Sequence, residues 1–205
     1  MEDFPSPKII LITGPKHSGK TTAGAVLAEL LGAEFVDLDE LVERQTGKSP
    51  RSLFKEGPEL FRQAEARALA SLASATLPGT AGRGQEVVWV VAAGGGLADN
   101  AGALELLRGQ GFPENDTAIV SLEVSADTAW ERICEAAKET GEWPAFFNAE
   151  NPRETNAALH ARRSAAYGEI ASLTVNGEGK TAEAIGREIA LRLAPAALRK
   201  ENVRE

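Results

Sequence analysis

The sequence predicts an α/β protein of three layers, in which a central five-stranded parallel sheet is flanked by helices on both faces. Short apolar segments alternate with longer segments of helical spacing, and the most hydrophobic short segments are rich in β-branched residues. Strands that alternate with helices usually form a parallel sheet, because each helix carries the chain back across one face of that sheet.

The predicted strands are short. Ile9–Thr13 is an apolar run of the kind that is buried on both faces of a sheet, and Glu34–Asp37 is the second strand. The remaining strands are expected at residues 87–92, 117–124 and 173–175.

Helices are expected between these strands. The first begins near Thr21 and stops at Gly32. The others are expected at residues 38–43, 52–75 with a boundary at Gly57 and Pro58, 127–139, 156–170 and 181–193. Residues 141–152 contain two prolines and three aromatic residues among polar ones, which suits a mobile flap. The mostly charged residues after Pro195 are expected to fray.

Composition limits the classes of function. A chain of 205 residues with 43% hydrophobic content can form one domain with a substantial core, and we expect a single domain over residues 1–205. The net charge of -8 argues against a nucleic-acid partner. A single cysteine, Cys134, excludes an intramolecular disulfide and a cysteine-cluster zinc site. The first residues lack the pattern of a signal peptide, and no run of about 18 apolar residues occurs, so we expect a cytoplasmic protein without a membrane partner. The oligomeric state is not readable.

A glycine-containing loop follows the first strand directly. Residues 14–21 fit the pattern G-x-x-x-x-G-K-[ST], with a predicted strand before them and a predicted helix after them. Gly14 and Gly19 allow the backbone N–H groups to point inward, and the helix adds its positive end. Lys20 can then reach the β- and γ-phosphate oxygens of ATP, while the Thr21 hydroxyl can ligate Mg²⁺. The pattern therefore predicts a P-loop NTPase fold; the alternative is an accidental glycine loop with an exposed lysine.

Two carboxylates stand one residue apart at the end of the second predicted strand. Asp37 and Asp39 could serve one Mg²⁺ ion and one polyol, since Mg²⁺ prefers oxygen ligands. The alternative is that Asp39 and Glu40 only cap the next helix. His17 lies inside the glycine loop, and because that loop binds through its backbone, we expect a tolerated and partly exposed side chain.

From the loop onward, the sequence resembles the shikimate kinases over most of residues 8–193. The shared motifs occur in the same order and at similar spacing: Phe35-Val36-Asp37-Leu38-Asp39, Thr46-Gly47-Lys48-Ser49, Phe54, Phe61-Arg62 with Glu65, Gly94-Gly95-Gly96, and Leu159 with Arg163 and Tyr167. The resemblance implies an ATP-dependent kinase of a small hydroxy acid, with shikimate 3-phosphate as the first candidate product, in aromatic amino acid biosynthesis. It also implies a substrate-binding helical region at about residues 38–75 and a lid at about 133–155.

The resemblance implies a role for each matching position. Asp37 would hold Mg²⁺ together with Thr21, and Asp39 would bind substrate hydroxyls and accept the proton of the attacking one. Arg62 and Arg163 would clamp the substrate carboxylate, although each arginine taken singly is more often a surface residue. The catalytic residues would be Lys20 and Asp39, and the substrate would contact Asp39, Arg62, Gly94, Gly95, Gly96 and Arg163. The nucleotide would contact Gly14, Pro15, Lys16, His17, Ser18, Gly19, Lys20, Thr21, Thr22 and Arg132.

The sequence departs from the family in the lid. The family carries an arginine immediately before a proline there, whereas this chain has Trp143 before Pro144. Loss of an arginine that stabilises a moving phosphoryl group can cost on the order of 10³-fold in rate. His17 is a smaller departure, because it stands where the family usually has glycine.

Three explanations of the tryptophan are open. Another cation, with Lys138 and Arg153 as candidates, could take over the role. The substrate could be a different polyol or hydroxy acid, or the chain could bind nucleotide without transferring phosphate and serve as a regulatory protein.

Overall fold

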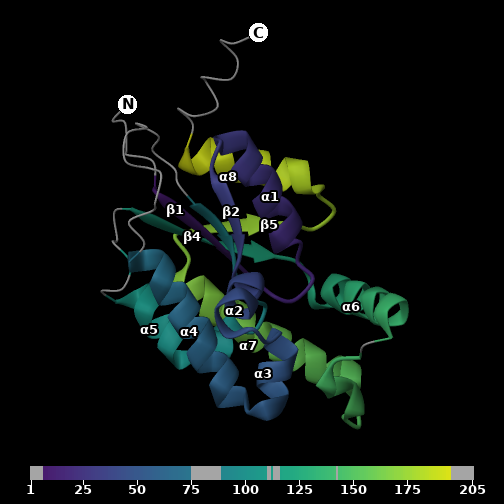
Figure 1. Cartoon of the computed structure of the whole chain (residues 1–205). Helices are drawn as coiled ribbons and strands as arrows, with labels where there is room; N and C mark the ends of the chain where they lie inside the picture. Colours follow the sequence, from purple (N-terminus) through teal and green to yellow (C-terminus); the bar gives the residue numbers. More distant parts are fainter. Residues whose placement is uncertain (1–6, 75–88, 110–111, 113–115, 142, 195–205) are drawn as a thin grey trace.

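The computed structural model describes residues 7–74, 89–109, 112, 116–141 and 143–194. Its centre is a sheet of five parallel strands in the order β2-β3-β1-β4-β5 (Figure 1). The strands are β1 (Ile9–Thr13), β2 (Glu34–Asp37), β3 (Trp89–Ala92), β4 (Thr117–Glu123) and β5 (Leu173–Asn176). The predicted fold class is confirmed.

Helices cover both faces of this sheet (Figure 1). On one face lie α1 (Lys20–Leu31) and α8 (Ala182–Leu193), which pack against each other. The other face carries α4 (Pro58–Ser74), α5 (Ala101–Arg108) and α7 (Pro152–Ile170), with α2 (Leu38–Thr46) and α3 (Pro50–Glu56) packed on α4. Helix α6 (Ala126–Thr140) packs along α7.

The place of β1 at the centre of the sheet explains why residues 9–12 are all apolar. Ile9 and Leu11 belong to the hydrophobic core beneath α4 and α7, whereas Ile10 and Ile12 belong to the core beneath α1 and α8. Because successive side chains of a strand point to opposite faces, a strand buried on both faces needs apolar residues at every position. Burying each such side chain contributes about 1.5–3 kcal/mol.

The expected break at Gly57 is present and separates α3 from α4. Other boundaries differ from the prediction for local reasons. Helix α7 begins at Pro152 rather than at residue 156, since proline fits the first turn of a helix. Helix α5 was not predicted at all; Asn100 caps it by accepting a hydrogen bond from the N–H of Ala103.

Two short 3₁₀ helices complete the described elements, η1 (Leu97–Asp99) after β3 and η2 (Ala145–Asn148) in the expected flap. Residues 87–88 of the third predicted strand and the residues after 194 lie outside the described ranges. Among the helices within those ranges, none is both long enough and apolar enough to cross a membrane.

The parallel sheet determines where a ligand can bind. The carboxyl ends of all strands meet at one edge, and in open α/β sheets ligands bind in the crevice outside that edge. The glycine loop leaves the end of β1 in the middle of the sheet, and the carboxylates of residues 37 and 39 lie at the end of β2 and just after it. Gly94 and its neighbours follow β3, between those two segments.

Candidate active site

The glycine loop joins the end of β1 to the start of α1. Gly14 has a φ of 139° and Gly19 a φ of 97°, which other residues rarely adopt. A Cβ atom at Gly14 would also lie 2.3 Å from the carbonyl oxygen of Leu122, so the loop is packed closely against β4. Helix α1 has no side-chain cap and no acidic residue in its first turn. Its first N–H groups are therefore available to an anion, as in sites that bind phosphate.

His17 holds the loop in an unusual backbone conformation. Its φ of 59° is the one positive value of a non-glycine residue among those the structure describes. This left-handed conformation costs about 1–2 kcal/mol for an ordinary side chain. The carbonyl oxygen of His17 accepts a hydrogen bond of 3.1 Å from Arg132 on α6, which ties the loop to that helix. Burial, followed by the charges of Lys16, Lys20 and Arg132, lowers the pKa of the imidazole.

Lys20 is buried beneath the loop. Its Nζ atom donates a hydrogen bond of 2.7 Å to the carbonyl oxygen of Pro15, and Ser18 Oγ lies 3.5 Å away. Burial lowers the pKa of Lys20 to about 8, although the carboxylates of Asp39 and Asp37 oppose this shift. Phosphate oxygens bound in the loop would favour the charged ammonium form for the same reason that those carboxylates do.

Thr21 and Asp37 lie side by side at the mouth of the loop. The Thr21 hydroxyl donates a hydrogen bond of 3.0 Å to Asp37 Oδ2. The other carboxylate oxygen, Oδ1, accepts the N–H of Asp39 at 2.9 Å and thereby caps α2. The cap of α2 is therefore Asp37 rather than Asp39 or Glu40, which occupy the first turn of that helix.

The half-buried Asp39 and the buried Glu65 both lie beside Gly94. Asp39 Oδ1 and Glu65 Oε1 are buried without hydrogen-bond partners, and they lie 2.9 Å and 3.3 Å from the point where a Cβ atom of Gly94 would be. Burial, and then the charge of Asp37, raises the pKa of Asp39. Burial raises the pKa of Glu65 to about 7, against the opposing hydrogen bond of 2.8 Å that its Oε2 accepts from Asn100.

The predicted arginines line a common cavity. Arg62, Arg162 and Arg163 border a volume of about 270 Å³ together with Ala98, Asp99 and Ala166. Arg163 donates two hydrogen bonds to Asp99 Oδ2, at 2.7 Å and 3.2 Å, and Arg162 bonds to Asp99 Oδ1 at 2.6 Å. Arg62 is held less firmly, because its nearest carboxylate oxygen, on the exposed Glu59, is 3.9 Å away.

The glycines after β3 allow three elements to approach one another. A Cβ atom on Gly95 would lie 2.8 Å from the backbone nitrogen of Lys16, which is closer than a Cβ atom normally comes to any atom that is not bonded to it. The equivalent atom on Gly96 would lie 3.7 Å from the Arg163 guanidinium, an ordinary contact. Tyr167 accepts a hydrogen bond from the N–H of Ala98 and donates one to the carbonyl of Gly94, and so links α7 to this turn.

Trp143, in the lid, packs against other aromatic side chains. Its ring meets that of Phe147 edge to face, with 4.6 Å between the ring centroids. Phe147 in turn stacks on Trp130 of α6 at 5.0 Å. Arg153, a candidate for the missing cation, instead pairs with Asp127 at 2.8 Å, and both side chains are largely exposed.

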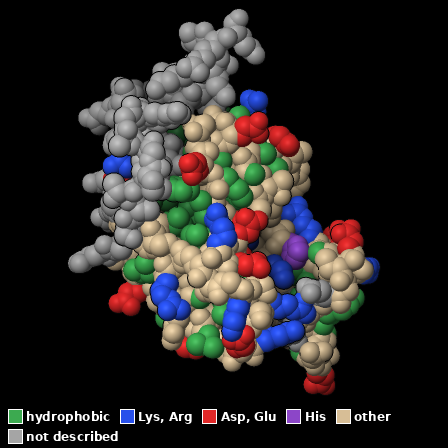
Figure 2. All heavy atoms as spheres, in the orientation of Figure 1, with side chains coloured by type: hydrophobic (Ala, Val, Ile, Leu, Met, Phe, Trp, Pro, Cys, Tyr) green, Lys and Arg blue, Asp and Glu red, His purple; other side chains and the backbone are tan. Residues whose placement is uncertain are grey.

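Charged side chains gather at this part of the surface. Figure 2 shows Lys and Arg side chains close to Asp and Glu side chains and to a histidine around a hollow on one face of the molecule. Within the described residues, no group of three or more His, Cys, Asp or Glu side chains is arranged to hold a metal ion by itself. A metal at this site would have to take ligands from a bound nucleotide as well.

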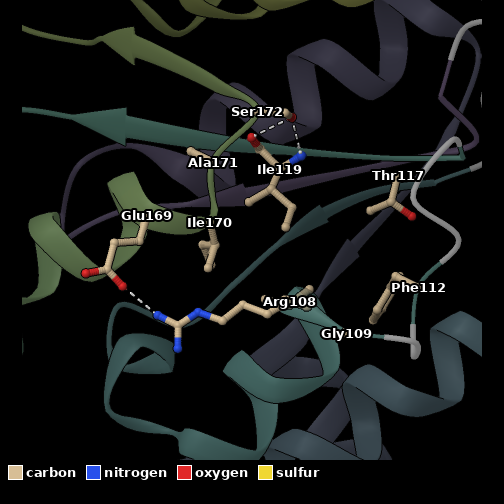
Figure 3. A pocket seen from close by; sticks show the side chains of 10 residues that line it. Arg108, Gly109, Phe112, Thr117, Ile119, Glu169, Ile170, Ala171 and Ser172 are labelled. Carbon is tan, nitrogen blue, oxygen red and sulfur yellow. Dashed lines mark hydrogen bonds and ion pairs between the residues drawn. The ribbon is translucent and has the colours of Figure 1, made fainter.

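A cavity of about 340 Å³ lies away from these residues. It is bordered by the end of α5, the end of α7 and the start of β4, near the amino ends of the strands. Figure 3 shows Arg108 reaching across it to Glu169, with which it forms an ion pair of 2.6 Å. Because ligands of open α/β sheets bind at the opposite edge, we place the active site at the glycine loop.

Three residues of the site were not predicted to have a role. Asp99 pairs with Arg162 and Arg163 of α7, and Asn100 both caps α5 and hydrogen-bonds Glu65. His160 lines a small cavity with Lys16 and Arg163. An asparagine before a run of helix-forming residues is a capping signal, so Asn100 could have been found from the sequence. The other two contacts join segments far apart in the chain and leave no local pattern.

Comparison with known proteins agrees with this geometry. The shikimate kinase family matches residues 16–194 of the chain. The shikimate kinase of Chlorobium chlorochromatii is 34% identical over 203 residues, which cover 95% of this chain and 97% of that protein. The shikimate kinase of Geobacter sulfurreducens is 36% identical over 182 residues, or 88% of each.

Solved structures lead to the same family. A shikimate kinase from Acinetobacter baumannii in complex with shikimate superposes with a TM-score of 0.73 at 28% identity, covering 94% of this chain and 96% of that one. The shikimate kinase of Aquifex aeolicus superposes with a TM-score of 0.69 at 27% identity, with coverage of 93% and 98%. The chain therefore belongs to the shikimate kinase family, whose members are kinases that use ATP.

Proposed function

We propose that this protein transfers the γ-phosphate of MgATP to the 3-hydroxyl of shikimate. The observation that carries the proposal is the meeting of three kinds of group at one edge of the sheet. These are a loop built to bind phosphate, the half-buried carboxylate of Asp39 beside it, and a cavity lined by arginines. Family membership and the shikimate complex of the Acinetobacter protein support shikimate as the acceptor.

The nucleotide would lie with its phosphates in the glycine loop. The free N–H groups at the start of α1 would bind phosphate oxygens, and Lys20 would exchange its bond to Pro15 for one to the β- and γ-phosphates. Thr21 and Asp37 fit a Mg²⁺ ion, because they place a hydroxyl and a carboxylate oxygen 3.0 Å apart at the mouth of the loop. When bound there, Mg²⁺ would neutralise part of the phosphate charge.

Asp39 is suited to the acceptor hydroxyl. Its unpartnered Oδ1 can accept a hydrogen bond from that hydroxyl, and its raised pKa makes it a stronger base than an exposed aspartate. The acceptor oxygen then forms a bond to the γ-phosphorus as the bond to ADP breaks in line with it. Asp39 takes the hydroxyl proton.

Arg62 and Arg163 would bind the acceptor carboxylate in the 270 Å³ cavity. Asp99 holds Arg163 in place through two hydrogen bonds, which orients the guanidinium before the acceptor arrives. The helices within residues 38–75 and the lid around 133–155 are the elements that would close the site over its ligands. A cytoplasmic location, and the absence of nucleic-acid and membrane partners, stay predictions.

The test is to identify the phosphorylated product. Shikimate, related hydroxy acids and simple polyols are each incubated with MgATP, and the products are resolved by ³¹P NMR. We expect shikimate 3-phosphate, about 10²-fold or more slower formation by Asp39→Asn, and a KM for shikimate raised about tenfold to hundredfold by Arg62→Ala. Phosphorylation of another acceptor alone would assign a different substrate. Saturable ATP binding, lost in Lys20→Ala, without any product would assign a nucleotide-binding protein.

A further inference from the structure

The segment of the lid that joins α6 to α7 contains no positively charged residue. Residues 141–151 contain no lysine and no arginine. Trp143 packs on Phe147, which stacks on Trp130, so these aromatic residues hold the lid segment against α6. Phosphoryl transfer on a P-loop nevertheless needs positive charge at the transferred group, since negative charge is spread over its three equatorial oxygens.

Most other cations around the site already have partners. Arg162 and Arg163 are bonded to Asp99, and Arg153 is paired with Asp127. Arg132 donates to the backbone of the glycine loop. In the proposed function, Lys20 binds the β- and γ-phosphates. The transferred phosphoryl group therefore needs one further cation to stabilise its negative charge.

Lys16 has neither a hydrogen bond nor an ion pair from its side chain within the described part of the chain. It belongs to the glycine loop itself, and its side chain is exposed. Its backbone lies against Gly95, the turn that follows β3 on the acceptor side of the loop. It also lines a cavity of about 30 Å³ with Asn156, His160 and Arg163, which places it next to the arginine that would hold the acceptor.

The charge of Lys16 acts on both halves of the site. Lys16 lies in the loop that would bind the phosphates, and its backbone packs against Gly95, whose neighbour Gly94 lies beside Asp39 Oδ1. A single cation therefore lies within electrostatic reach of the phosphate-binding lysine and of the carboxylate proposed for the acceptor. From this position, the Lys16 ammonium group can stay close to the phosphoryl group while that group moves from ATP to the acceptor.

We propose that Lys16 is a further catalytic residue, whose ammonium group contacts the transferred phosphoryl group between ADP and the acceptor. In the step that it assists, the acceptor oxygen forms the new bond to phosphorus, and the bond from phosphorus to the bridging oxygen breaks with its electrons going to ADP. The hydroxyl proton moves to Asp39, and Lys16 keeps its own proton throughout. This inference rests on the proposed function for the identity of the acceptor.

The test compares Lys16→Met, which removes the charge but keeps the length, with Lys16→Arg, which restores a charge. Lys8→Met is the matched control, because Lys8 pairs with Asp116 at the opposite edge of the sheet. We expect Lys16→Met to lower kcat by roughly 10²-fold, with ATP affinity changed by less than about threefold. Lys16→Arg should recover most of the lost rate, and Lys8→Met and Arg153→Met should stay near the parent.

A second measurement detects the role without any acceptor. The complex of MgADP with aluminium fluoride mimics the transferred phosphoryl group, so Lys16→Met should bind it about 10²-fold more weakly while binding MgADP as the parent does. Equal affinity for that complex, or an unchanged kcat, would overturn the inference. A parent enzyme that does not phosphorylate shikimate would refute the proposed function instead, and the aluminium fluoride measurement would still decide the role of Lys16.

Discussion

The buried carboxyl group of Glu65 makes stability depend on pH in an unusual direction. Its side chain is 1% exposed, and burial raises its pKa from the ordinary 4.5 to about 7. Below pH 4.5 the group is protonated whether the chain is folded or unfolded. Between pH 4.5 and 7 the unfolded chain loses the proton while the folded chain keeps it, so the free energy of unfolding falls as the pH rises.

The size of the effect follows from the two pKa values. A rise from 4.5 to about 7 corresponds to about 3 kcal/mol of destabilisation at pH 8, when the group is ionised in both states. Roughly 2 kcal/mol of this should develop between pH 5.5 and 8. Glu65→Gln removes the titration but keeps the shape. The amide oxygen can still accept from Asn100, and the amide N–H can turn toward the unpartnered Asp39 Oδ1.

The assay is urea unfolding of the parent and of Glu65→Gln at several pH values from 5.5 to 8. The variant should gain stability relative to the parent as the pH rises, by roughly 2 kcal/mol over this range. The same substitution at Glu29, an exposed residue of α1, controls for the general effect of removing a carboxylate. A stability difference between parent and Glu65→Gln that stays constant over the whole range would refute the reasoning.

Two further predictions concern the metal and the turn after β3. Asp37→Asn keeps the cap on α2, because asparagine caps as well as aspartate, but removes the charge beside Thr21. The Mg²⁺ concentration for half-maximal activity should therefore rise about tenfold or more with little change in the urea midpoint, and a reversed pattern would assign Asp37 to the fold alone. Gly95→Ala should cost about 1–3 kcal/mol and weaken ATP binding, since its Cβ would lie 2.8 Å from the Lys16 backbone. Gly168→Ala, in an open position of α7, should instead add about 1 kcal/mol, and equal effects in unfolding curves would contradict this contrast.

The centre of the sheet was readable from the sequence because its strands β1, β3 and β4 are short and strongly apolar. Residues 9–12 of β1 are buried on both faces of the sheet, so none of them is polar. Helix α5 escaped prediction because Gly96, Gly102 and Gly109 make its surroundings resemble a loop, and only the cap at Asn100 marked its start.

The phosphate loop was also readable, since its spacing encodes backbone geometry. Gly14 and Gly19 adopt the positive φ values that the pattern requires. The pairing of Asp99 with two arginines of α7, and the burial of Glu65 beside Gly94, depend on contacts between distant segments. No local pattern reports such contacts, because they arise only when the sheet brings its strand ends together.

The lid was readable only as an irregular segment. Its two prolines predicted the break between α6 and α7, and the break is present. The partner of its aromatic residues, Trp130, lies on the preceding helix, and its stacking with Phe147 could not be inferred from spacing.

The most direct test is the initial rate of ADP release at saturating MgATP, with and without shikimate, for the parent and for Asp39→Asn. Transfer to a bound acceptor at this edge of the sheet predicts ADP release that depends on shikimate, saturates with its concentration and falls about 10²-fold or more in the variant. An ADP release rate that is the same with and without shikimate would contradict it.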